Sequence, residues 1–225
     1  MDYYKFLNKN ENHNGMHYQY GLNTDIRPFY PHGDCTKGGI YFSREDILAF
    51  INKGQWIRKV TLPEGEEIYE NPGFPKKWKA HRVILGRKYK VTAKVVQRLI
   101  EEGADVHADN DYALRWASAY GEIEIVRVLL ENGANVHAQE ECALCWASNH
   151  GETEIVKLLL ENGADATVNN NEPSYLALER GHTNVVKLLK KAQWKARCPK
   201  LFQGLVSLFT KDFCFWKNPK NRQNH

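Results

Sequence analysis

Apolar residues in the second half of the chain recur at helical spacing. Leu114, Ala117 and Ser118 share one face at the spacing i, i+3, i+4, and after Gly121 a second apolar face begins at Ile125. The pattern predicts two short helices separated by a glycine turn. A helix this short is marginal alone, so we expect neighbouring helix pairs to stack and bury their apolar faces together.

The same pattern is written more than once. Gly121, Gly151 and Gly181 are thirty residues apart, and that offset superimposes "YALRWASAYGEIEIVRVLLENGANVHA" on "CALCWASNHGETEIVKLLLENGADATV". Partial copies read "AKVVQRLIEEGADVHAD" upstream and "EPSYLALERGHTNVVKLLKKA" downstream. We therefore predict an all-α solenoid over residues 87–192, with about 3.5 units and a 30-residue period. Gly133 is expected to end the second helix of its unit in a left-handed conformation.

These copies resemble the ankyrin repeat. Its pattern runs through "TPLHxAAxxGHxEIVxLLLExGADVNA", and "EIVKLLLENGADA" and "EIVRVLLENGANVHA" match it almost letter by letter. The resemblance implies a stack of helix pairs that binds a partner protein on its concave side.

Two departures from the ankyrin pattern predict local changes. The family period is about 33 residues, and three residues are missing at the inter-unit fingers, at 108–112 and 138–142, so the fingers should be short. The "TPLH" box reads "YALR" and "CALC", which removes the usual Thr and His hydrogen bonds. Trp116 and Trp146 follow the box, and we expect both to be buried between units.

The helical period is absent before residue 91. Segments rich in β-branched and aromatic residues predict strands separated by turns, namely "GGIYF" (38–42), "WIRKVTL" (56–62) and "HRVILG" (81–86). One helix is predicted at "SREDILAFI", with Ser43 as N-cap and Asp46 completing a capping box. We expect a small α+β domain over 1–86 that packs directly on the first helix pair, because no Gly/Ser linker separates them.

The whole arrangement also resembles the ankyrin repeat proteins of amoeba-infecting giant viruses of the mimivirus type. The segments "YKFLN", "NGMHYQYGLN", "KGGIYF" and "WIRKVTLP", followed by shortened ankyrin units, carry this resemblance. It implies a viral protein that acts inside a host cell on a host protein.

Charge is distributed unevenly along the chain. The net charge is +4, but nine basic residues against Asp212 give residues 190–225 about +8, and the remainder is near −4. This argues against a nucleic-acid-binding body. For the basic, aromatic tail at 193–225, three alternatives stay open: a cap on the last repeat, a membrane-surface helix, or a docking peptide.

Localisation is predicted from what the sequence lacks. The start "MDYYKFLNKN" has no apolar signal-peptide run, five cysteines are an odd and sparse count, and no stretch approaches ~20 apolar residues. We expect a cytoplasmic, intracellular monomer without a membrane span.

Few residues indicate chemistry. Cys142 and Cys145 form a C-x-x-C without a second pair at zinc spacing, so we interpret them as small helix residues rather than metal ligands. His107 and His137 are interpreted as loop residues. No Walker loop, G-x-G-x-x-G or G-x-S-x-G occurs, and we expect no cofactor and no metal.

Two functions from different classes remain. The leading one is a non-enzymatic protein-interaction module. The alternative is that the N-terminal domain is a modifying enzyme targeted by the repeats, because "KGGIYF" faintly resembles a strand of ADP-ribosyltransferases. That alternative requires a His or Arg on the first strand and a late Glu, and the chain supplies neither in a matching context.

The partner-binding face is predicted where the copies disagree. Positions expected to be buried hardly change between units, whereas those at the ends of the first helices and at the fingers vary. The varying positions, which should line the concave side, are Ala119, Asn149 and Glu179; Tyr120, His150 and Arg180; and Asp111, Glu141 and Asn171. The competing interpretation is drift on solvated faces.

Overall fold

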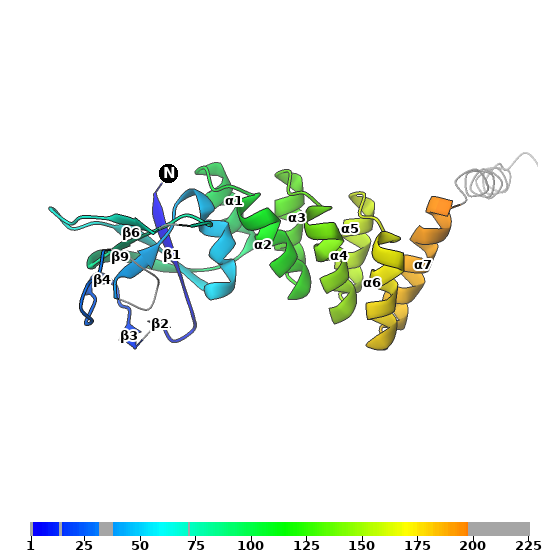
Figure 1. Ribbon diagram of the computed structural model, residues 1–225, viewed down its shortest axis with the longest axis horizontal. Coiled ribbons are helices and arrows are strands. Elements are labelled where there is room, and N and C mark those ends of the chain that lie inside the picture. Colours follow the sequence, from blue (N-terminus) through cyan, green and yellow to red (C-terminus); the bar gives the residue numbers. More distant parts are fainter. Residues whose placement is uncertain (1, 14, 32–37, 72, 198–225) are drawn as a thin grey trace, which may run out of the picture.

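The structure, a computed structural model, describes residues 2–13, 15–31, 38–71 and 73–197. Strands gather at one end and helices step away from them in pairs (Figure 1). The strands are β1 (Tyr3–Leu7), β2 (Asn12–His13), β3 (Met16–His17), β4 (Gly21–Thr24), β5 (Ile40–Phe42), β6 (Trp56–Thr61), β7 (Tyr69–Asn71), β8 (Lys77–Ala80) and β9 (Arg82–Lys90). The helices are the 3₁₀ helix η1 (Glu45–Lys53) and α1 (Ala93–Glu101), α2 (Ala108–Ala119), α3 (Ile123–Glu131), α4 (Ala138–His150), α5 (Thr153–Glu161), α6 (Val168–Glu179) and α7 (Thr183–Arg197).

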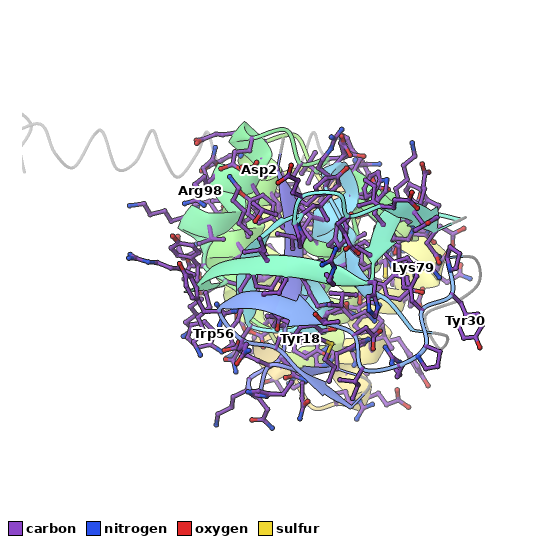
Figure 2. The ribbon with its side chains drawn as sticks, turned by 90° about the vertical axis from the view of Figure 1, so that its left-hand side faces the viewer. Asp2, Tyr18, Tyr30, Trp56, Lys79 and Arg98 are labelled. Atoms are coloured by element: carbon purple, nitrogen blue, oxygen red, sulfur yellow. The ribbon has the colours of Figure 1, made fainter. Side chains whose placement is uncertain are left out.

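The strand-rich end is built from antiparallel pairs. One sheet has the order β1-β6-β9-β4, a second has the order β5-β8-β7, and β2 and β3 form a small hairpin. Successive side chains of β1 alternate between two cores, because a strand points neighbouring residues to opposite faces. Tyr4 and Phe6 join the core shared with the helices, whereas Leu7 joins a core confined to the strands. Figure 2 views this end, with the strands in front of the helices.

All three predicted strands are present, as β5, β6 and β9. The predicted capping box is wrong. Arg44 occupies the N-cap position of η1 and makes no capping hydrogen bond through its side chain. Ser43 instead donates to the Lys76 carbonyl at 2.7 Å, and Asp46 accepts from the Lys76 amide at 2.6 Å. Both polar side chains therefore fasten the turn before β8 to η1.

The helices form two rows. In the outer row α1, α3, α5 and α7 contact one another in turn, and in the inner row α2 contacts α4, which contacts α6. The positions that stay constant between copies are buried as predicted, among them Ala117, Ala147 and Ala177. Gly133 has φ +89°, and the Ala134 amide donates to the Leu129 carbonyl at 3.0 Å, so its predicted left-handed role is confirmed.

The predicted packing of the strand-rich part on the first helices is confirmed, and η1 makes the contact. It lies against α2 and so extends the inner row. The Asp105 amide donates to the Glu45 carbonyl at 2.8 Å, and the Tyr4 hydroxyl donates to Glu102 at 2.5 Å. Burial and the bond to Glu102 raise the pKa of Tyr4 to about 12. Ile47 belongs to one continuous core with the ankyrin-like helices.

The connections between helix pairs are short, as expected, and the first turn within the bounds of α2, α4 and α6 is left-handed. Three consecutive residues have positive φ at each of 109–111, 139–141 and 169–171. Left-handed backbone is unfavourable for residues with a Cβ, and Asn and Asp tolerate it best. The run of three Asn at 169–171 is therefore well suited to its turn.

The last helix, α7, continues to Arg197, past the predicted end of the repeats at residue 192. The tail was predicted to begin at residue 193, so 193–197 belong to α7, and residues 198–225, on which the three alternatives depend, lie outside the described part of the chain.

Candidate functional site

The inner helices expose aromatic side chains near their C-terminal ends. Tyr120 is 66% exposed and Trp146 is 49% exposed. The rings of Trp116 and Tyr120 lie 5.3 Å apart, and Trp146 stacks on His150 at 6.1 Å. We call the residues Trp116, Tyr120, Trp146, His150 and Arg180 the inner strip. Large aromatic groups that are held in place and still reach solvent are typical anchors of protein interfaces.

A cavity of about 580 Å³ adjoins this strip where the strand-rich part meets the helices. One wall is formed by Asn52 at the end of η1, Gln55 just before β6, and Lys90 at the end of β9. The other is formed by α2, α3 and α4, with residues Tyr112, Arg115, Trp116, Tyr120, Glu122 and Trp146. We call it the junction cavity. It combines an aromatic wall with charges of both signs, so it can bury an apolar group and bond a polar one.

The left-handed turn at 109–111, within the first turn of α2, positions the cationic side chain of this cavity. The Arg115 guanidinium donates to the carbonyl of Asp109 at 2.6 Å and of Asn110 at 3.1 Å. It also lies 5.2 Å from the centre of the Tyr112 ring. Burial raises the pKa of Tyr112, so its hydroxyl stays protonated and can donate a hydrogen bond. The turn thus holds Arg115 and Tyr112 together at the cavity wall.

The predicted site residues differ in accessibility. Tyr120, His150, Glu179 and Arg180 are exposed, and Asn149 and Asn171 are half-buried. Asp111, Ala119 and Glu141 are buried, so the expectation that they face a partner is wrong for these three.

The burial of the two acidic residues has a specific cause. The Asp111 carboxylate accepts from the Asn135 amide of the following turn at 2.8 Å and pairs with His107 Nδ1 at 3.0 Å. Glu141 pairs with His137 in the same way. Both histidine contacts are local, four residues apart, and the bond from Asn135 joins two successive turns of the stack. The histidine four residues before each acid was the signal that sequence reasoning missed.

Ala119 is buried because α2 lies between η1 and α4, so its end is covered on both sides. The equivalent residue of the last unit is Glu179, at the end of α6. Among the described residues α6 has only one neighbour in the inner row, α4, and Glu179 is exposed.

Trp146 is the other correction. We expected it to fill the space between units, but Leu144 and Ala147 are fully buried whereas Trp146 is about half exposed. Trp116 is half-buried and packs against the core, so the expectation holds better for it.

The C-x-x-C pair has no chemical signature of a thiolate site. Cys145 is buried, and burial raises the pKa of its thiol to about 12, so it stays protonated at neutral pH. Cys142 is half-buried, and both thiols are free. Among the described residues no group of three His, Cys, Asp or Glu side chains is placed to hold a metal ion.

Comparison with known proteins gives the fold its family. A family model described as "Ankyrin repeats (3 copies)" matches residues 87–170 and 137–199. The chain belongs to the ankyrin repeat family. Two relatives named as ankyrin repeat proteins of Acanthamoeba polyphaga mimivirus are 38% identical over 122 residues and 33% identical over 135 residues. These matches cover 48% and 55% of this chain.

The chain spans only 38% and 64% of the length of those two relatives. An uncharacterized protein of the same virus is 33% identical over 134 residues, which are 55% of this chain and 94% of the relative. The ankyrin repeats indicate a role in protein–protein interaction. Among the helices that the structure describes, none combines the length and apolar character needed to cross a bilayer.

Proposed function

We propose that this ankyrin repeat protein binds a host protein through its inner strip and the adjoining junction cavity, without catalysing a reaction. The observation that carries the proposal is the exposed pair Tyr120 and Trp146 beside a cavity of about 580 Å³. Interfaces concentrate their binding energy in such aromatic anchors next to pockets. In ankyrin stacks the inner helices line the concave side, which is the side we assign to the partner.

The proposal includes the architecture of the stack. Helices α2, α4 and α6 begin at Ala108, Ala138 and Val168, which supports a 30-residue period. With α1 ahead of them and η1 beside α2, about three and a half units are formed. In this proposal the protein acts as a monomer in the host cytoplasm, and the strand-rich domain caps the first units of the stack.

The alternative of a modifying enzyme lacks a supporting observation. The cavity of about 320 Å³ in the strand-rich part is lined by His13, but none of the described residues lining it is an Asp or Glu. A transferase of the kind considered would need a carboxylate facing such a group.

Affinity capture from amoebal host extract tests the proposal. Replacing Tyr120, His150 and Arg180 together by Ala should abolish capture of the proteins that co-purify with the unmodified chain, because the variant loses the Tyr120 anchor, the His150 ring that stacks on Trp146, and the Arg180 charge. The fold should persist, since exposed substitutions usually change stability by less than ~0.5 kcal/mol each.

The matched control replaces the equivalent exposed positions of the outer row, Arg127, Lys157 and Lys187, by Ala. This variant should retain the captured proteins. Equal capture by both triple variants would show that the inner strip is not the binding face.

A further inference from the structure

The strand-rich part contains a second cavity, of about 320 Å³, between β1, the segment that follows it, β5 and η1. Its lining includes four basic side chains, Lys5, His13, Lys53 and Lys77. No Asp or Glu is present among the described residues that line it. We call it the cationic cavity. Its volume lies at the lower end of the range that small-molecule sites occupy, roughly 300–1,000 Å³.

Two lysines of the lining, Lys5 and Lys77, lie against Tyr41. Lys5 Nζ donates to the Tyr41 carbonyl at 2.8 Å and lies 4.7 Å from the centre of the Tyr18 ring. Lys77 Nζ lies 5.4 Å from the centre of the Tyr41 ring, and Lys79 Nζ, from the same strand, lies 5.7 Å from it. Tyr18 and Lys79 are labelled in Figure 2. The tyrosine rings therefore hold several ammonium groups within one small region.

The positive charge of these lysines affects the pKa of His13. Burial lowers the pKa of the His13 imidazole, and the nearby charges of Lys5 and Lys53 lower it further. Nearby cations oppose protonation of an imidazole because they make the electrostatic potential at its position positive. A cavity with that potential attracts an anion.

One wall of the cavity is apolar. Phe6 and Phe42 are buried, and Phe50 is half-buried at its edge. Aromatic walls of this kind accept a flat ring by stacking or edge contact. The cavity thus presents cations on one side and aromatic rings on the other.

We propose that the cationic cavity binds a small ligand in which a phosphate monoester is attached to an aromatic ring. Lys53 and Lys77 bind the phosphate, and the ring packs against Phe50. A phosphate monoester carries ≈ −1.5 to −2 charge at pH 7 and suits several lysines better than a single carboxylate does. The site is separate from the junction cavity and does not depend on the protein-binding proposal.

Phenyl phosphate is the smallest probe with both parts. Isothermal titration calorimetry of the full chain at pH 7 should give saturable binding of phenyl phosphate. Inorganic phosphate and phenol, titrated separately, should each bind at least tenfold more weakly. Equal affinity for inorganic phosphate would overturn the assignment of a ring to the apolar wall, and the absence of saturable phenyl phosphate binding would overturn the site.

Charge reversal locates the binding. Lys53→Glu should weaken phenyl phosphate at least tenfold, and Lys53→Arg should preserve most of the affinity. Lys187→Glu, which makes the same charge change at an exposed position of α7, should leave the affinity unchanged. Equal weakening by Lys53→Glu and Lys187→Glu would mean only general electrostatic attraction. Lys77→Gln tests the second lysine, and matching thermal unfolding of all variants verifies that they are folded.

Discussion

Side chains two residues apart in an inner helix can differ completely in burial. Leu144 has no exposed surface and touches the continuous core, whereas Trp146, two residues on, is about half exposed. A helix turns by about 100° per residue, so positions two apart lie on nearly opposite faces. Size and hydrophobicity suggested a core role for Trp146, but the helical position decides its environment.

Truncation should separate these roles. Trp146→Ala is expected to cost less than about 1 kcal/mol of unfolding free energy, in the range of surface changes. Leu144→Ala should cost about 2–5 kcal/mol, because it leaves a cavity in packed surroundings. Urea unfolding followed by circular dichroism measures both. A loss for Trp146→Ala comparable with that for Leu144→Ala would show that the indole is buried after all.

At the scale of elements, the left-handed turns distinguish this stack. The short connections were predicted from the three residues missing at 108–112 and 138–142. The left-handed backbone was not, because Gln139 and Glu140 are ordinary residues whose φ of 52° and 55° is imposed by the helices on either side. Tertiary packing overrides local preference there.

Glycine should be favourable in such a turn. Gln139→Gly is expected to raise stability by about 0.5–1 kcal/mol, since glycine removes the Cβ penalty of left-handed backbone, partly offset by its greater chain entropy when unfolded. Lys157→Gly, also exposed but in the middle of α5, should lower stability by about 1 kcal/mol. Opposite signs in thermal unfolding would support the turn geometry; a loss at both positions would contradict it.

The strand-rich part shows where sequence reasoning stops. The three predicted strands have β-branched or aromatic runs, whereas β1, β2, β3, β4, β7 and β8 were missed. Strand β1 buries Lys5 beside its aromatics, and β8 buries Lys79, so neither reads as a strand with one polar face. Their burial depends on partners distant in sequence. For the same reason the cavity lined by the end of β9 and the side of α2 could not be foreseen.

At the scale of the whole molecule, η1 joins two parts of different secondary structure into one core. Leu48 and Ile51 of η1 are fully buried in the cluster that continues through Val96 and Leu114 to the later helices. A shared core makes unfolding cooperative across both parts.

Leu48→Ala should therefore destabilise the ankyrin helices although it lies outside them. We expect a loss of about 2–5 kcal/mol. Amide hydrogen exchange should show lower protection in α1 and α2 as well as in β1. Ala49, in the same helix, is already small, so Ala49→Gly serves as a helix control with a loss of about 1 kcal/mol. Reduced protection confined to the strands would mean that the two parts unfold independently.

The position of η1 bears on how such chains can be recombined. It precedes the repeats in the sequence, yet its apolar side packs against α2. If the two parts were joined by gene fusion near residue 90, the two sides of this interface would come from different genes. A fusion that attaches this strand-rich segment to a foreign repeat array will fold only if the new first inner helix offers a matching apolar face. If domain shuffling produced such chains, correlated substitutions are expected between the residues of η1 and α2 that face each other.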